Sequence, residues 1–255
     1  MEKLKIYANS LLAPVIFLAV WQLLSNAGLL LDVILPSPLK AVKAFGGIIN
    51  DGTLFIDLKT SGFRVLTGYF FGVLIGLFLG LLCGLSKVIE RFLNPVVNMI
   101  RQIPLYAWIP LIILWFGIGE TSKHVIITES VFIPVFLNTL QGVRGVSNDY
   151  VEVANVLELS RLKLILKVIF PSALPSIFTG LRLGSGAAWM AVVAAEMLGG
   201  LKGLGYGLMQ ARDFLRSDKL IALMAVVGLL GFLCDKLIRR LEGISLRWRK
   251  GFEGK

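Results

Sequence analysis

Residues 65–86 have the sequence VLTGYFFGVLIGLFLGLLCGLS, which contains no charged side chain. A helix needs about 20 apolar residues to cross the hydrocarbon core of a bilayer, so this segment predicts a transmembrane helix over roughly residues 63–85. Small residues at every fourth position let two helix backbones approach closely, so the glycine face of this helix is predicted to pack against another helix. Its members are Gly68, Gly72, Gly76, Gly80 and Gly84.

The whole chain has the composition of a membrane protein. Of its 255 residues, 56% are hydrophobic and 16% are charged, and the mean hydropathy is +0.80. A soluble domain has about 45–50% apolar and about 25% charged residues. Transmembrane barrels alternate apolar and polar residues, whereas the apolar runs here are continuous. We therefore predict an all-α fold, a polytopic membrane helix bundle.

About six transmembrane helices are expected from the apolar runs. Pro104 and Pro110 interrupt the third of them, which predicts a kinked or unwound helix there. An amphipathic segment over residues 39–60 follows the first span and is expected at the membrane interface. The predicted spans cover roughly residues 9–31, 63–85, 95–117, 124–143, 172–198 and 219–239.

The net charge of +10 fits this topology. Lysine and arginine flank the apolar runs and do not gather on a soluble face, which argues against a nucleic-acid-binding protein. They are more frequent on the side that would hold both termini, so both termini are predicted to be cytoplasmic.

The chain lacks the residue clusters on which catalysis or metal binding depends. Cys83 and Cys234 lie inside apolar runs, and His124 is the single histidine, so neither a disulfide framework nor a metal spacing is present. No Walker A sequence occurs, and the glycine-rich residues 199–205 follow a span, where a Rossmann context fails. We expect a protein that is not an enzyme, with no catalytic, metal or cofactor site.

A polar helical segment, SNDYVEVANVLELSRLK over residues 147–163, separates the fourth and fifth predicted spans. Val153, Val156 and Leu157 have the spacing of one helix face, and Asp149 is a plausible N-cap. The segment is too polar to span the membrane, so it is expected to present a cytoplasmic helix over about residues 149–160 to a soluble partner.

This segment resembles the "EAA" loop of binding-protein-dependent ABC importer permeases, whose pattern is E-A-A, three residues, G, nine residues, I-x-L-P. The spacing matches from Glu152-Val153-Ala154 to Val168-Ile169-Phe170-Pro171, with Glu158 at the glycine position. Glycine reaches positive φ cheaply, whereas glutamate is strained there. Either the helix continues past Leu157, or a local bond holds Glu158 at the helix end.

The resemblance extends from about residue 10 to residue 249. The matching segments look like the nitrate/sulfonate/taurine/bicarbonate branch of that family; they include Arg101-Gln102-Ile103-Pro104, Ala107-Trp108-Ile109-Pro110-Leu111, Trp115-Phe116-Gly117-Ile118-Gly119-Glu120, Thr179-Gly180-Leu181-Arg182, Ala195-Glu196-Met197 and Gly203-Leu204-Gly205-Tyr206.

The resemblance implies a fold, a function and partners. The fold is a type I ABC importer permease core over residues 59–243, preceded by a transmembrane helix and linker over 1–58 and followed by a basic tail over 244–255. The function is the import of a small, anionic solute across the bacterial or archaeal inner membrane. The implied partners are two cytoplasmic ATP-binding subunits, a second permease copy as a homodimer, and an extracytoplasmic solute-binding protein.

Alternatives remain open at this stage. An ion-coupled secondary carrier would need intramembrane carboxylates near the midplane. The same ABC system could also import a vitamin precursor such as a pyrimidine. A membrane enzyme would need clustered acidic or His/Cys groups at one membrane face, and no such cluster is found.

Two sets of candidate site residues follow. The resemblance implies contact with the ATPase for Glu152, Val153, Ala154, Leu157, Glu158 and Pro171. Candidates for the translocation pathway are Arg101, Trp108 and Arg182. An arginine inside a span faces either a cavity or a partner, so Arg182 lines the pathway or pairs structurally. Glu129 and Glu196 are expected to have interfacial or structural roles, and either could pair with an arginine of a neighbouring helix.

Overall fold

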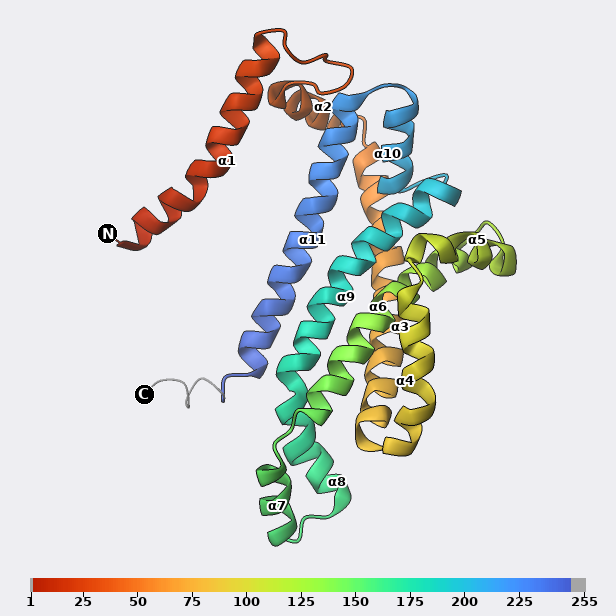
Figure 1. Cartoon of the computed structure of the whole chain (residues 1–255). Helices are drawn as coiled ribbons and strands as arrows, with labels where there is room; N and C mark the ends of the chain where they lie inside the picture. Colours follow the sequence, from red (N-terminus) through yellow and green to blue (C-terminus); the bar gives the residue numbers. More distant parts are fainter. Residues whose placement is uncertain (1, 249–255) are drawn as a thin grey trace. The chain divides into compact units, whose positions relative to one another are not determined.

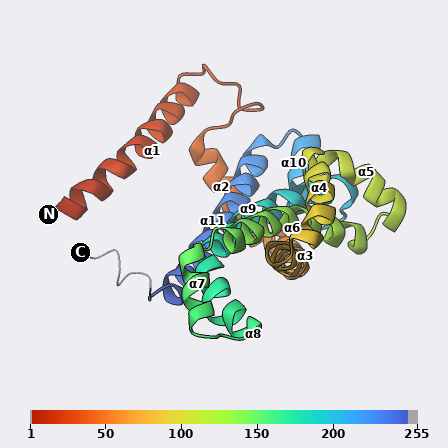
Figure 2. The same cartoon turned by 60° about the horizontal axis from the view of Figure 1, so that its bottom comes forward.

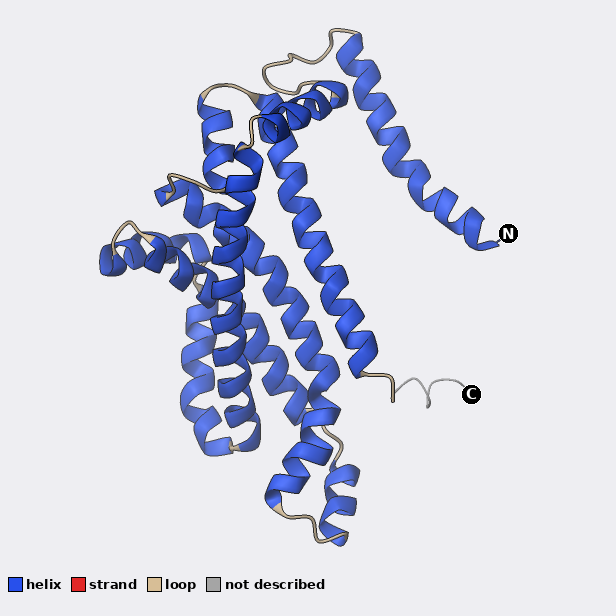
Figure 3. Cartoon of the chain, turned by 180° about the vertical axis from the view of Figure 1, so that it is seen from behind, coloured by secondary structure: helices blue, strands red, loops and turns tan. Residues whose placement is uncertain are grey.

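The computed structural model describes residues 2–248, with side chains from Leu12 onward, and this part of the chain forms helices and no strand (Figure 3). Figure 1 labels these helices along the chain. In order they are α1 (Glu2–Asn26), α2 (Pro38–Asn50), α3 (Thr53–Leu85), α4 (Lys87–Gln102), α5 (Leu105–Phe116), α6 (Glu120–Arg144), α7 (Asn148–Val156), α8 (Arg161–Leu164), the π-helical segment η1 (Ile165–Ile169), α9 (Phe170–Gly199), α10 (Leu204–Asp213) and α11 (Ser217–Ser245).

The described residues form two compact units. The first unit comprises the residues up to Thr60 together with Leu201–Gly228, and the second comprises Ser61–Gly200 together with the residues from Leu229 onward. The domain boundaries expected near residues 58 and 243 stay a prediction.

In the first unit, local capping defines two short helices. The Ser37 hydroxyl accepts a hydrogen bond from the Lys40 amide at 3.3 Å, and Pro38 opens α2, where a missing N–H costs nothing. The Asp57 carboxylate, on the first turns of α3, accepts a hydrogen bond from the amide of Gly203 at 2.8 Å. Gly203 is the N-cap of α10 at φ +119°, a conformation that favours glycine. Asp57 thereby places a negative charge where the helix dipole of α10 is positive.

In the second unit, the glycine face of α3 packs directly on α6, as the sequence predicts. A methyl group built on Gly72 would lie 2.6 Å from Cβ of Val131, and one on Gly76 would lie 2.9 Å from Cβ of Val135. The same close approach holds along the whole face, which pairs Gly68, Gly80 and Gly84 with Ile127, Thr139 and Val143. No side chain other than hydrogen fits at these five positions of α3.

The neighbouring face of α6 is packed against α9. A methyl group on Gly180 would approach Cβ of Asn138 to 2.9 Å, and one on Gly184 would lie 3.2 Å from Val131. Val131 and Val135 are fully buried. Helix α6 therefore packs against α3 on one face and against α9 on another.

Helix α4 folds back beside α3 after a very short connection. Ser86 caps α4, which already begins at Lys87, so the connection is one residue long. Phe136 of α6 is fully buried in the cluster that this hairpin completes, with Cys83 of α3 and Val97 of α4. Helix α4 is amphipathic, and it buries Val97 on the face that packs against the bundle.

The third predicted span is broken, as its prolines predict. Helices α4 and α5 meet at 102° across Ile103 and Pro104. Ile103 is extended (φ −84°, ψ 121°) because the ring of the following proline excludes the helical conformation. Pro104 has no amide hydrogen and can therefore stand ahead of the first turn of α5.

The fifth span begins earlier than expected. The sequence predicts a start near residue 172, whereas the helix runs from Arg161 to Gly199 through α8, η1 and α9. In η1 the Phe170 amide donates to the Ile165 carbonyl, one residue further back than in an α-helix. This π-turn lets Pro171, which cannot donate, continue the helix without breaking it.

Four described helices are long and apolar enough to cross a membrane, and the bent α4–α5 pair can make a fifth span. Helix α1 is apolar over Leu12–Asn26, where its side chains are described. These helices agree with the predicted spans that begin near residues 63, 95, 124, 172 and 219.

We predict that Gly76→Leu lowers the stability of the bundle by about 1–3 kcal/mol, because the new side chain forces α3 away from Val135. Thermal denaturation of the detergent-solubilised protein measures the loss. Gly62→Leu is the matched control on the same helix, since nothing lies within 4 Å of a methyl group at Gly62. Equal melting temperatures for the two variants would contradict the packing argument.

Candidate functional site

Helix α7 and the start of the fifth span form a helical hairpin that projects beyond the ends of α6 and α9 (Figure 1, Figure 2). The hydroxyl of Ser147 accepts from the Asp149 amide at 3.3 Å, so Ser147 is the N-cap and the expectation of Asp149 in that role is wrong. Asp149 lies in the first turn, where its negative charge interacts favourably with the positive end of the helix dipole.

Glu158 ends α7 in the conformation that glycine usually adopts. Its φ is +52°, and the amides of Glu158 and Leu159 donate to the carbonyls of Asn155 and Ala154 at 3.0 and 3.1 Å. These two bonds form a Schellman motif, which satisfies carbonyl groups that a helix end leaves free. Of the two sequence-based alternatives, the structure has the one in which a helix end holds Glu158, and α7 does not continue to residue 160.

The apolar side chains of α7 point outward. Val153, Val156 and Leu157 are 58%, 82% and 66% exposed, and Tyr150 on the preceding turn is 60% exposed. Glu152 is exposed beside them. Ala154 differs, because it is 3% exposed and faces inward, away from that surface.

The remaining coupling candidate, Pro171, lies apart from this surface. It is in the first turn of α9 and half-buried. The structure thus brings Glu152, Val153, Leu157 and Glu158 together on α7 and its C-terminal turn, whereas Ala154 is buried and Pro171 lies in α9.

The three pathway candidates occupy different environments. Nε of Arg182 donates to Asp235 of α11 at 2.9 Å, and a second carboxylate, that of Glu242, lies 3.9 Å from the guanidinium. Arg182 is therefore neutralised by a structural pair. Arg101 is exposed in the last turn of α4, and Trp108 is half-buried in α5 with an indole N–H that has no hydrogen-bond partner among the described residues.

A charge network, in which Arg64 and Glu196 are buried and Glu120 is exposed, ties three helices together at the end of α6 opposite α7. Arg64 of α3 donates to Glu196 of α9 at 2.7 Å and to both carboxylate oxygens of Glu120 of α6, at 2.7 and 2.5 Å. The Ser61 hydroxyl lies 2.7 and 2.9 Å from the two Glu196 oxygens, and Lys123 contacts Glu120 at 3.0 Å. Glu196 is 0% exposed and Arg64 4%, so these charges depend on one another for solvation.

The sequence signals only part of this network. An arginine of a neighbouring helix was one possible partner for Glu196, and Arg64 of α3 is that partner. The partner could not be named, because Arg64 lies 132 residues away in the chain and at the margin of a predicted span. Glu129 is the opposite case, since its Oε2 is buried and has no partner among the described residues.

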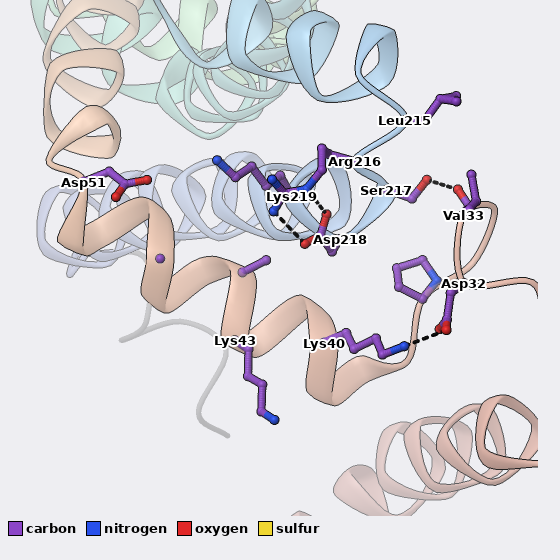
Figure 4. A pocket seen from close by; sticks show the side chains of 13 residues that line it. Asp32, Val33, Lys40, Lys43, Asp51, Leu215, Arg216, Ser217, Asp218 and Lys219 are labelled. Atoms are coloured by element: carbon purple, nitrogen blue, oxygen red, sulfur yellow. Dashed lines mark hydrogen bonds and ion pairs between the residues drawn. The ribbon is translucent and has the colours of Figure 1, made fainter.

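A polar hollow of about 630 Å³ lies in the first unit, lined by α2 and by the turn that begins α11 (Figure 4). Lys40 pairs with Asp32 at 2.6 Å, and Arg216 pairs with Asp218 at 3.0 Å. The hydrogen bond from Arg216 to Asp218 raises the pKa of the arginine, which stays charged at any physiological pH. Lys43 and Lys219 line the same hollow. Among the described residues, no three His, Cys, Asp or Glu side chains gather as a metal site would require.

We predict that Arg64→Ala costs about 3–5 kcal/mol of stability, because it leaves the Glu196 carboxylate buried without its guanidinium. The measurement is thermal denaturation in detergent. Arg212→Ala is the control, since its pair with Asp213 is half-exposed and contributes about 0–1 kcal/mol. A loss no larger than the control's would mean that the network is solvated and dispensable.

We predict that Glu158→Gly stabilises the end of α7 by about 1 kcal/mol, because glycine adopts positive φ without a Cβ clash. Hydrogen exchange of the Leu159 amide, which closes the Schellman motif, should slow accordingly. Asn155→Gly serves as the control within α7, where glycine costs about 1 kcal/mol and exchange should accelerate. Faster exchange in Glu158→Gly would show that the glutamate side chain itself holds the turn.

The described architecture and sequence have clear relatives. The model of the family "Binding-protein-dependent transport system inner membrane component" matches residues 72–244. SsuC of Bacillus subtilis, a permease protein named for aliphatic sulfonate transport, is 40% identical over 97% of this chain and 90% of its own length. The taurine transport system permease protein TauC of Escherichia coli is 35% identical over 91% of this chain and 86% of its own length.

Solved structures support the fold. A chain from the crystal structure of an amino acid ABC transporter superposes with a TM-score of 0.64 at 21% identity, covering 78% of this chain and 97% of that one. The all-helical bundle is therefore that of a type I ABC importer permease. The chain belongs to the family of binding-protein-dependent transport system inner membrane components, and it is a multi-pass permease subunit of an ABC importer.

Proposed function

We propose that this permease imports a small organosulfonate or a similar oxyanion, driven by an ATP-binding subunit that docks on α7. The single observation that carries the coupling part is the exposed apolar face of α7. Val156 alone keeps 82% of its surface accessible, in a nine-residue helix that follows a membrane span. The substrate part is supported by the names of two relatives, which are for aliphatic sulfonates and for taurine.

The geometry of α7 suits insertion into a groove. Tyr150, Val153 and Leu157 have the i, i+3, i+7 spacing of an amphipathic helix that lays one face into an apolar cleft. Glu152 and Glu158 flank that face and are available to basic groups at the rim of the cleft. Ala154 acts indirectly, since its small buried side chain lets α7 pack against the start of the fifth span.

The orientation of the permease in the membrane follows from this docking. If α7 meets a cytoplasmic ATPase, the network of Arg64, Glu120 and Glu196 lies at the outer end of the bundle, since α6 has 25 residues and is about 37 Å long. We also infer that both termini are cytoplasmic, as the distribution of lysine and arginine along the chain favours. Two permease copies with two ATPase subunits would complete the importer, and ATP hydrolysis belongs to those subunits.

Among the basic residues proposed for the pathway, Arg101 is the better candidate for contact with an anion. It is exposed and has no ion-pair partner among the described residues, whereas Arg182 is held by Asp235. It lies just before the helix break, where α4 ends at Gln102 and the span turns. An extracytoplasmic binding protein would deliver the anion and set most of the selectivity.

We predict that Val153→Asp and Leu157→Asp each weaken ATPase association at least tenfold, about 1.4 kcal/mol, because a charge must then enter the apolar cleft. Co-purification of the ATP-binding subunit with each variant, and ATP-dependent uptake of an aliphatic sulfonate in proteoliposomes with the binding protein, measure the effect.

Leu201→Asp is the matched control, since Leu201 is 83% exposed in the loop between α9 and α10. Wild-type recovery of the ATPase with both α7 variants would place the docking surface elsewhere. Intact ATPase binding without sulfonate uptake in the wild type would leave the coupling surface standing and reject the substrate.

A further inference from the structure

The last turns of α11 carry two parallel stripes of opposite character. Leu237, Leu241 and Ile244 are 59%, 49% and 51% exposed and follow one another at helical spacing. Lys236 and Arg240 are exposed one position earlier in each turn, which puts them on the adjoining strip of the helix surface. Directly after the helix the pattern repeats with Arg247 and the 55% exposed Trp248.

The acidic residues of this segment are turned the other way. Asp235 pairs with Arg182 of α9 and with Arg239 at 2.7 Å, and Glu242 lies towards the same Arg182. No ion pair or hydrogen bond of the Lys236 or Arg240 side chain occurs among the described residues. The helix therefore uses its carboxylates internally and leaves two cations facing outward beside an apolar stripe.

The position of the stripes along α11 places them at the edge of a membrane. The charge-free stretch of α11 runs from Leu220 to Cys234 and ends at the Asp235 carboxylate. At about 1.5 Å per residue this stretch is shorter than the hydrocarbon core of about 30 Å, so the next turns complete the crossing. Lysine and arginine at such a place lie with their stems in the apolar layer and their charges among the headgroups.

We propose that the end of α11, from Lys236 to Trp248, is a binding surface for anionic phospholipid. The phosphate of the headgroup would bind Lys236, Arg240 and Arg247, while the acyl chains would lie along Leu237, Leu241 and Ile244. The pairing of a basic strip with an exposed apolar strip favours a lipid over free phosphate, since inorganic phosphate could use only the charges. This surface does not depend on the function proposed for α7.

The test uses the permease–ATPase complex in nanodiscs that contain phosphatidylcholine and phosphatidylglycerol. Native mass spectrometry after release counts the lipids that remain bound. Each basic residue near an anionic surface contributes about fivefold to binding, so Lys236→Gln with Arg240→Gln should reduce the excess of phosphatidylglycerol strongly, by an order of magnitude or more. The Lys236→Arg, Arg240→Lys exchange retains both charges and should keep the preference.

Lys43→Gln with Lys59→Gln is the matched control, because it removes two exposed lysines elsewhere in the chain. An equal loss of phosphatidylglycerol in this control would reduce the effect to net charge and overturn the proposal. Displacement of the lipid by inorganic phosphate would also overturn the proposal. So would a Lys236→Gln, Arg240→Gln variant that loses the ATP-binding subunit but keeps its phosphatidylglycerol. If the neutral variant fails to assemble, photoreactive phosphatidylglycerol must label the Lys236–Trp248 segment of the wild type; labelling confined to other segments rejects the site.

Discussion

Contact between the backbone of α3 and the β-branched side chains of α6 is the constraint on which the second unit depends. The hydrophobic effect does not drive apolar helices together inside a bilayer, so van der Waals contact in close packing has to supply the attraction. Five positions without a side chain on α3 meet Ile127, Val131, Val135, Thr139 and Val143 on α6. Because the pairs repeat every four residues on both helices, all five contacts form together in a single register of α3 against α6. A slip of one residue would set side chains against backbone along the whole length.

That register determines where the charges meet. Arg64 precedes Gly68 by four residues and so continues the contact line of α3 by one turn, which brings it to Glu120 at the start of α6. The glycines of α9 set the second contact, and Glu196 follows Gly184 on the same helix to reach Arg64. A buried arginine between two carboxylates tolerates little misalignment, since an unpaired charge at this depth is costly. The ion network thus depends on the packing of α3, α6 and α9 and also stabilises it.

The two ends of α6 have different physical roles. At its first turn, buried charges fix α3, α6 and α9 to one another. Beyond its last turn, α7 leaves an apolar surface uncovered and closes its own end with the Glu158 turn. In the function proposed above, this uncovered helix is the surface on which the ATP-binding subunit docks. The π-helical segment η1 joins α8 to α9 as one continuous helix, whereas residues 157–160 separate α7 from α8.

The sequence alone determined the class of structure and most of its spans, because charge-free runs and proline positions act locally. The glycine spacing of residues 68–84 even indicated a packing face, and the pattern of residues 147–163 indicated the helical segment in which α7 lies. Other features were open to it only as alternatives: whether Arg182 lines a pathway or pairs, and whether Glu158 continues or ends a helix. The tertiary structure shows that Glu158 ends α7 and that Arg182 pairs with Asp235. It also decides the partner of Glu196, the inward side of Ala154 and the one-residue turn before α4. The partner of Glu196 depends on which helices become neighbours, because Arg64 lies 132 positions away and no local pattern in the chain encodes that contact.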